Sequence, residues 1–207
     1  MVYRTTQKMA DRKQARRDRI LDKAIRLFGK KGFHATTVPM IVRAAGSSTG
    51  AFYLYFRNKE DVFGAAMELL GARIASAINE AAAAAPPGVL SHMQAAVGAL
   101  IRFLAENPEE ARILIVESSG LGKNLETIRR RILDSHVRGV QQALDALAGQ
   151  LPPMDTAVAA QCWTGAVYEA AFHWLEQPPD RRVTPERLIA EVTAFNLRAI
   201  GAAEKRR

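Results

Sequence analysis

Apolar side chains recur at every third or fourth position along most of the chain, the spacing that places them on one face of an α-helix. No long run alternates apolar and polar residues, so the pattern predicts no strand. Glycine, proline and capping residues divide the pattern into nine expected helices, over residues 11–31, 38–46, 48–56, 59–85, 89–105, 109–118, 125–147, 156–176 and 185–202. The sequence therefore predicts an all-α fold.

Five of the expected helices begin after a residue whose side chain can accept a hydrogen bond from the unpaired backbone N–H groups of the first turn. These capping residues are Thr36 or Thr37, Ser47 or Ser48, Asn58, Asp155 and Thr184. Pro39 and Pro185 fall in the first turns of two of these helices, where a missing N–H is harmless. The starts of these helices are therefore predicted from local signals.

The segment 36–59 contains two short helix patterns that meet at Gly46, a residue that can reverse the chain where a Cβ would clash. Phe52 and Phe56 lie four residues apart in the second pattern, so both can face the first helix of the chain. A short helix anchored by two aromatic rings on one side leaves its other side available to a partner. This arrangement is typical of a DNA-reading helix-turn-helix.

The other side of this second short helix carries hydroxyl groups. Thr49 and Tyr53 are four residues apart, and with Tyr55 they can donate to phosphate oxygens or base edges. Lys59 adds a positive charge at the start of the next helix, where backbone N–H groups already favour an anion. The alternative is a small helical subdomain whose tyrosines are partly buried.

Positive charge is concentrated in the first third of the chain. Residues 1–62 contain 14 Lys and Arg against 5 Asp and Glu, a net charge of +9, whereas the rest of the chain has a net charge of −1. A basic module attracts phosphate backbones. This imbalance favours a nucleic-acid partner over a charged face that serves only solubility.

Composition and motifs restrict the remaining possibilities. The 207 residues include one cysteine, Cys162, which excludes an intrachain disulfide and which we expect in the core. The basic, polar N-terminus does not look like a secretory signal, and the uncharged run 81–101 contains two prolines, so we expect a cytoplasmic protein without a membrane span. We expect a flexible basic arm over residues 1–10, a helix-turn-helix domain over 11–60 and a larger helical domain over 61–207.

The residues 20–63, from Ile20 to Phe63, resemble the N-terminal head of the tetracycline-repressor (TetR) family. The shared features are the helix that closes on Gly32-Phe33, the Thr36-Thr37-Val38 entry, the Ala45-Gly46 turn, Ser48, Gly50, Tyr53, Tyr55-Phe56 and the Asn58-Lys59-Glu60 helix start. These residues are about a fifth of the chain, and the spacing is matched throughout. The remainder is similar to the family in length and number of helices, and the resemblance implies that residues 61–207 form an effector-binding and dimerisation domain.

The resemblance implies a sequence-specific, DNA-binding transcriptional regulator: a repressor released from a palindromic operator by a small-molecule effector. It implies a phosphate contact at Thr37, a groove-facing start of the second short helix, and backbone contacts at its far end. The candidate DNA-binding residues are Thr37, Ser47, Ser48, Thr49, Gly50, Tyr53, Tyr55 and Lys59. Ser47 stands where an apolar residue is common in the family, Val42 where alanine is common, and Thr49 where lysine is frequent, so base preference is not carried over.

The last two helices carry small residues and a wide apolar stripe, which together with the resemblance predict pairing with a second copy of the chain in a four-helix interface. The candidate interface residues are Ala166, Ala170, Leu188, Val192, Phe195 and Ala199. The alternative is that both helices are buried within one monomer.

The resemblance also implies a small-molecule effector that binds within residues 61–207. This effector is unidentified, and we expect it to be partly apolar. Candidate effector-binding residues are Met93, Phe103, His136, Trp163 and Phe172, each of which also suits a place in the core. Tyr168, His173 and Trp174 share this character, and Glu117, Glu169 or His136 could orient a ligand if buried.

Enzymatic chemistry finds little support in the sequence. GLGKN, at 120–124, lacks the first glycine and the final Ser or Thr of a phosphate-binding loop. The four histidines are far apart in sequence, so we expect no catalytic residue, no metal site and no cofactor. A rival to the regulator is a helical protein whose basic head binds RNA or an acidic membrane without sequence preference.

Overall fold

The computed structural model describes residues 2–118 and 120–202, and within these residues it contains nine α-helices and no strand. The helices are α1 (Val2–Ala35), α2 (Val38–Ala44), α3 (Thr49–Tyr53), α4 (Lys59–Ala84), α5 (Val89–Glu106), α6 (Pro108–Arg112), α7 (Lys123–Ala146), α8 (Thr156–Glu176) and α9 (Pro185–Ala199). A π-helix, η1 (Ile113–Glu117), continues α6, and a 3-10 turn, η2 (Pro179–Arg181), precedes α9. The predicted all-α fold is confirmed.

The predicted N-caps are also confirmed, because capping depends on residues three positions apart. The side chains of Thr37, Ser48 and Asn58 accept from the backbone N–H groups of the first turns of α2, α3 and α4. Asp155 and Thr184 do the same for α8 and α9. At α4 a second bond strengthens the cap, since Asp61 accepts from the backbone N–H of Arg57 at 2.9 Å, and this bond lowers the pKa of Asp61.

Helix α1 is longer than the sequence pattern predicted. We expected a flexible arm over residues 1–10, but the helix begins at Val2, and residue 1 lies outside the described part of the chain. No glycine or proline interrupts residues 2–28, so nothing stops the helix once it has formed. Near its other end Gly32 has a φ of 79°, and the chain turns there toward α2.

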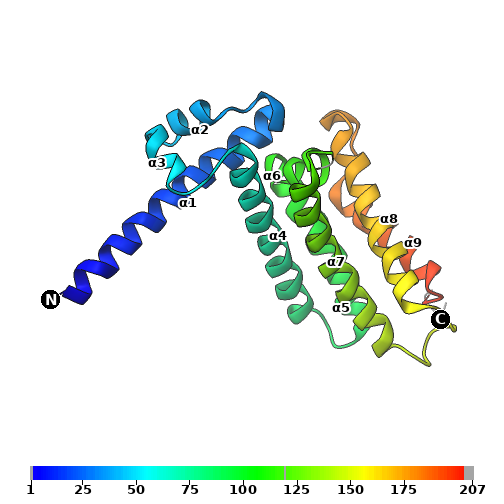
Figure 1. The fold of residues 1–207 in the computed structure, drawn as a ribbon. Helices are drawn as coiled ribbons and strands as arrows, with labels where there is room; N and C mark the ends of the chain where they lie inside the picture. The colour runs from blue at the N-terminus through cyan, green and yellow to red at the C-terminus, as the bar shows by residue number, and fades with distance from the viewer. Residues whose placement is uncertain (1, 119, 203–207) are drawn as a thin grey trace.

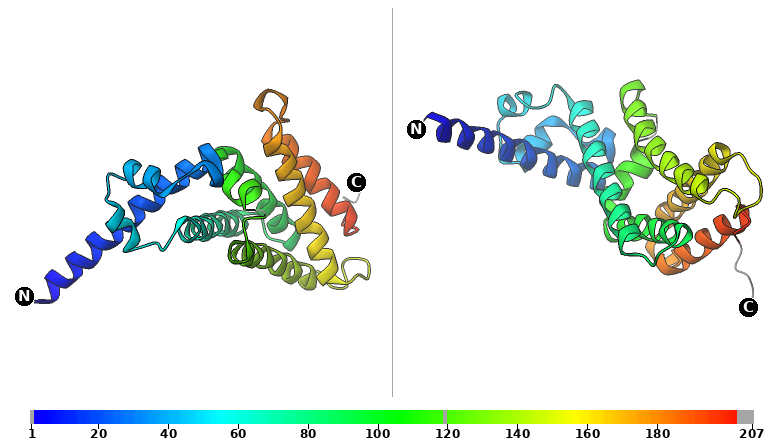
Figure 2. Two further views of the ribbon diagram at one scale, coloured as in Figure 1. Left: turned by 45° about the horizontal axis from the view of Figure 1, so that its top comes forward. Right: turned by 90° about the horizontal axis from the view of Figure 1, so that it is seen from below.

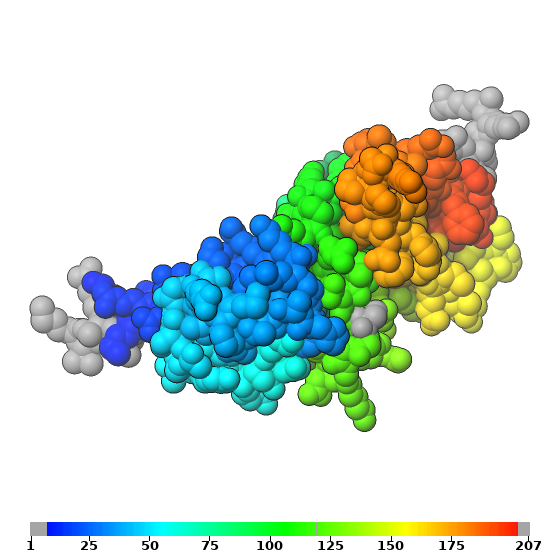
Figure 3. Space-filling view, turned by 90° about the horizontal axis from the view of Figure 1, so that it is seen from above, coloured from blue at the N-terminus to red at the C-terminus, as the bar shows by residue number. Residues whose placement is uncertain are grey.

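The molecule consists of a head and a body joined by α4 (Figure 1). Helices α1 to α3 form the head, and in the body α5 and α7 pack on α4, while α8 packs on α7 and α9 packs on α5 and α8. The N-terminal end of α1 projects away from both (Figure 2). In the space-filling view the head occupies one end of the molecule, and α8 and α9 occupy the other (Figure 3).

One continuous hydrophobic core runs from the head into the body. In the head Ile20, Phe28 and Phe52 are fully buried, and Phe28 makes an edge-to-face contact with Phe63 of α4, with ring centroids 4.9 Å apart. In the body α4 packs closely on α7, because a Cβ at Gly64 would lie 2.8 Å from the side chain of Ile128. The head is therefore fastened to α4 by core packing.

Two expectations about local structure are wrong. The helix expected over 109–118 is not uniform, since α6 ends at Arg112 and the next turn is a π-helix. Cys162 is exposed, because the buried face of α8 runs through Ala160, Trp163 and Val167 instead.

In the described part of the chain, no helix is both long and apolar enough to span a bilayer.

Candidate DNA-binding surface and ligand pocket

The two predicted aromatic anchors are both buried, although α3 ends at Tyr53, earlier than the helix expected over 48–56, so Phe56 follows the helix. Phe52 is fully buried and Phe56 is 2% exposed, and the guanidinium of Arg17 on α1 lies 5.3 Å from the centre of the Phe56 ring. Ile41 of α2 is also fully buried; α2 packs against α1, and α3 packs against α2. The opposite side of α3 is consequently turned outward.

That outward side carries most of the hydroxyls predicted to contact DNA. Thr49, Gly50 and Tyr53 are exposed, and a Cβ at Gly50 would meet nothing within 4 Å. Thr37 and Ser48 are exposed as well, and although their oxygens accept the capping bonds, each hydroxyl hydrogen stays available for a phosphate. These five residues are thus all exposed, one at the start of α2 and the others from the start to the end of α3.

The remaining candidates of the head are less accessible. Ser47 and Tyr55 are half-buried, and Tyr55 packs against the core. Leu54, which is 72% exposed beside Tyr53, was not among the predicted candidates. Helical spacing could have found it, because a residue two positions from Phe52 lies on nearly the opposite face. An exposed leucine here can contact the methyl group of thymine.

Lys59 has structural partners in addition to its predicted phosphate role. Its Nζ donates to the carbonyl of Phe33 at 2.9 Å and to that of His34 at 3.5 Å, and it lies 4.1 Å from the centre of the Phe33 ring. An ammonium has three N–H donors, so one can still reach solvent. Lys59 therefore joins the start of α4 to the end of α1.

Lys59→Met is expected to lower the free energy of unfolding by about 1–2 kcal/mol, because the charged hydrogen bonds to the α1 carbonyls are lost. It should also weaken binding to all DNA sequences alike and reduce the salt slope by about 1. Urea unfolding and binding at several salt concentrations measure the two effects. Lys123→Met, at an exposed lysine of the body, is the control, and an unchanged salt slope for Lys59→Met would contradict the phosphate contact.

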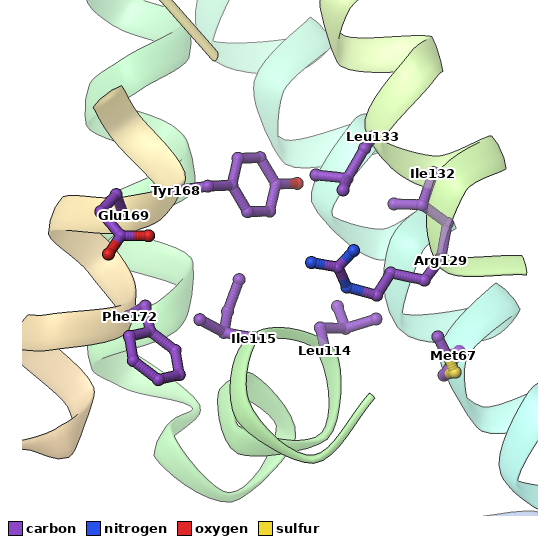
Figure 4. Close-up of a pocket in the computed structure, with 9 residues that line it drawn as sticks. All are labelled: Met67, Leu114, Ile115, Arg129, Ile132, Leu133, Tyr168, Glu169 and Phe172. Atoms are coloured by element: carbon purple, nitrogen blue, oxygen red, sulfur yellow. The ribbon is translucent and has the colours of Figure 1, made fainter. Parts of the chain in front are cut away.

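A pocket of about 270 Å³ opens between α4, η1, α7 and α8 (Figure 4). Its walls are Met67, Leu114, Ile115, Arg129, Ile132, Leu133, Tyr168, Glu169 and Phe172. Six of these nine residues are apolar and three are polar or charged, a composition that suits a small organic ligand.

The pocket agrees only in part with the candidate effector-binding residues. Phe172 lines it, and His136 lies behind it, bonded to the lining residue Tyr168. Met93 and Trp163 are buried in the core, and Phe103 packs against the core, so these three do not line the pocket. The sequence does not distinguish residues that line the pocket from residues of the core, since both are mainly apolar. It also gives no reason to choose Arg129 over its two arginine neighbours in the run 129–131.

The Tyr168 hydroxyl and His136 Nδ1 are 2.7 Å apart and form a hydrogen bond between α8 and α7. Burial lowers the pKa of His136 below 6.5, because the charged imidazolium is poorly solvated there. Burial also raises the pKa of Tyr168, so its phenol stays protonated at neutral pH. Both groups are therefore neutral under ordinary conditions.

The buried histidine makes stability depend on pH. The unfolded chain takes up a proton at His136 near pH 6.5, whereas the folded protein does so only at lower pH, so acidification through this window favours unfolding. We expect wild type to lose more free energy of unfolding than His136→Gln between about pH 7.5 and 5.5, measured by urea titration. His92→Gln, at an exposed histidine, should behave as wild type; parallel profiles for wild type and His136→Gln would contradict the prediction.

The π-helix η1 touches both the pocket and the head. Leu114 and Ile115 form part of the pocket wall, and Glu117 at the end of the same turn accepts from the backbone N–H of Phe33 at 3.1 Å. Arg112 lies 3.5 Å from the same carboxylate. A movement of η1 would therefore reach the turn between α1 and α2 directly.

The predicted interface residues have mixed positions. Phe195 is 59% exposed and Ala199 is exposed, whereas Val192 is 8% exposed and packs within the monomer. Ala166, Ala170 and Leu188 are half-buried. The neighbouring exposed side of α8 carries Val158, which is 54% exposed, and Cys162. Apolar side chains thus remain uncovered on both helices, and we refer to them together as the apolar strip of α8 and α9.

The head matches a protein-family model, "Bacterial regulatory proteins, tetR family", over residues 20–66. The whole described fold is similar to the crystal structure of a tetR-family regulatory protein from Rhodococcus RHA1, with a TM-score of 0.74, 25% identity, and coverage of 91% of this chain and 98% of that one. The chain belongs to the TetR family.

Two further comparisons place this TetR-family chain among described regulators. The HTH-type transcriptional regulator AcrR of Shigella flexneri is 36% identical over 105 residues, which are 50% of this chain and 47% of that protein. The chain matches less than half the length of the curated relatives that it resembles. AibR, whose structure contains isovaleryl coenzyme A and operator DNA, shares the fold at 20% identity with a TM-score of 0.71, covering 87% of this chain and 97% of that one.

Proposed function

We propose that this TetR-family chain is a homodimeric repressor that binds a palindromic operator and is released by a small molecule bound in its body. The observation that carries the proposal is the set of exposed hydroxyls at the start of α2 and along α3, within a segment, residues 1–62, that has a net charge of +9. Family membership and the operator complex of AibR support a DNA partner.

In this proposal α3 enters the major groove, and the hydroxyls around it contact the flanking phosphates. Thr37 and Tyr53 contact phosphates and so fix the position of the head on the DNA. The side chains at the start of α3 and the exposed Leu54 contact the base edges. Gly50 allows the backbone of α3 to approach the DNA closely.

The apolar strip on α8 and α9 would pair with its copy around a two-fold axis. Phe195 and Val158 provide the large apolar side chains, and exposed apolar groups of this kind suit an interface. The strip lies at the opposite end of the molecule from the head, so pairing leaves both heads free (Figure 3). Two recognition helices would then enter successive major grooves roughly 34–36 Å apart.

Release would follow from the pocket's position between the two ends of the molecule. Its walls include α4, which carries the head, and η1, whose Glu117 holds the backbone of Phe33. A ligand that prefers another arrangement of these elements changes the spacing of the two heads. The structure of the neighbour AibR contains both isovaleryl coenzyme A and operator DNA, so a protein of this fold can bind a small molecule as well as DNA.

DNase footprinting on the DNA upstream of the coding sequence tests the proposal. A short, two-fold symmetric protected region, lost when a pocket ligand is added, is the expected result. Uniform protection, or equal affinity for RNA or acidic vesicles, would favour the rival protein that binds polyanions without sequence preference.

A further inference from the structure

The polar groups of the pocket are unevenly distributed, and this indicates the chemistry of its ligand. The Arg129 guanidinium extends from α7 into the pocket on the same side as the Tyr168 hydroxyl (Figure 4). Glu169 lies across the pocket from Arg129 in the same view, and its side chain is 70% exposed and paired with His173 at 3.0 Å. The positive group is thus the better enclosed of the two, since the Arg129 side chain is 33% exposed.

Arg129 is only weakly satisfied within the protein. The contact that the structure gives its guanidinium is with Glu126 at 3.5 Å, on the same helix. A pair of this kind contributes little to stability, since both side chains are about one-third exposed. A ligand carboxylate could accept two parallel hydrogen bonds from the guanidinium, which is a much stronger arrangement.

The hydrogen bond between His136 and Tyr168 leaves a second donor for the same ligand group. A neutral imidazole carries one hydrogen, and His136 Nε2 is buried without a hydrogen-bond partner among the described residues. Unpaired buried N–H groups are rarer than unpaired acceptors, so the hydrogen belongs on Nδ1. Nδ1–H then donates to the Tyr168 oxygen, and the phenol O–H is free to donate elsewhere.

We infer that the pocket binds a small organic carboxylate, whose charged group is held by the Arg129 guanidinium and the Tyr168 O–H. Its apolar body would lie against Leu114, Ile115, Ile132, Leu133, Phe172 and Met67. A volume of about 270 Å³ suits a medium-chain fatty acid or a single-ring aromatic acid. This assignment rests on the proposed function, because it names the class of molecule that acts as the effector.

Isothermal titration calorimetry on the full-length protein without DNA tests the inference. The probes are octanoate, decanoate and phenylacetate, with octan-1-ol and octylamine as neutral and cationic matches of octanoate. At least one carboxylate is expected to bind, and octanoate more tightly than octan-1-ol by about tenfold or more. No binding by any of the three carboxylates at millimolar concentration, or equal or tighter binding of octan-1-ol or octylamine, would overturn the inference.

Two variants and one matched control locate the charged group. Arg129→Gln should weaken carboxylate binding by about 10- to 100-fold, and Tyr168→Phe should weaken it by about 3- to 10-fold. Arg130→Gln should bind as wild type, since Arg130 lies 3.5 Å from the same Glu126 but does not line the pocket. Unchanged affinity in Arg129→Gln would overturn the inference; if that variant does not fold, Tyr168→Phe and the comparison of wild-type ligands decide.

Two further measurements distinguish a free acid from a thioester as the ligand, and ligand binding from release of the operator. Octanoyl coenzyme A has no carboxylate on its acyl chain, so tighter binding of this thioester than of octanoate would overturn the inference. Carboxylate binding that leaves the operator complex intact would refute release in the proposed function, while the chemistry assigned to the pocket would stand.

Discussion

The Gly50→Glu substitution is expected to leave the protein folded and to weaken its binding to DNA by about 100-fold or more. Gly50 lies in the first turn of α3, its φ is not positive, and an added Cβ meets nothing within 4 Å, so a side chain fits there. An acidic residue in the first turn even suits the helix dipole. In the proposed complex, however, the new carboxylate would face the phosphates.

Fluorescence anisotropy with a labelled operator measures this change, and circular dichroism checks the fold. Gly139→Glu is the matched control, because Gly139 lies within α7, also has open space at its Cβ, and gives the same change in charge. The control should bind DNA as wild type. If Gly50→Glu bound equally well, the DNA surface would have to lie elsewhere, for example on the arginine face of α1 formed by Arg12, Arg16 and Arg19.

The Phe195→Glu substitution is expected to dissociate the dimer, raising its dissociation constant by about 1,000-fold or more. In a two-fold interface each change occurs twice, and burying each phenylalanine contributes about 2 kcal/mol. The side chain is 59% exposed in the monomer, so its replacement should not disturb the fold.

Sedimentation velocity over a range of concentrations measures the dimer. Met9→Glu serves as the control, since Met9 is 66% exposed but lies on the N-terminal part of α1, away from α8 and α9. A Phe195→Glu protein that sediments as a dimer at the same concentrations as wild type would show that the strip on α8 and α9 is not the interface.

Much of the head could be predicted from the sequence because its determinants are local. The caps at Thr37, Ser48 and Asn58 act on N–H groups three residues away, and each is found in the structure. The four-residue spacing of Phe52 and Phe56 predicted that both rings would be buried, and both are, although α3 ends before Phe56. The same spacing pointed the hydroxyls of α3 outward, and their contacts with DNA stay a prediction.

The pocket could not be predicted in this way, because its walls come from four elements far apart in sequence. Met93, Trp163 and Phe172 are similar in character, yet only Phe172 borders the cavity, since the packing of α4, α7 and α8 decides which apolar faces meet and which stay apart. A wide apolar stripe on α9 likewise gave no way to tell that Val192 is used within the monomer while Phe195 is left exposed.

The amino-acid sequence alone predicts the all-α class, the starts of five capped helices, the basic head and the family to which that head is similar. These properties depend on residue composition and on neighbours within one or two helical turns. Long-range packing, in contrast, places Lys59 against the end of α1, joins Glu117 of η1 to Phe33, and brings Arg129 and Tyr168 to one side of a pocket. Each of these depends on contacts between residues at least 25 positions apart, which local patterns do not encode.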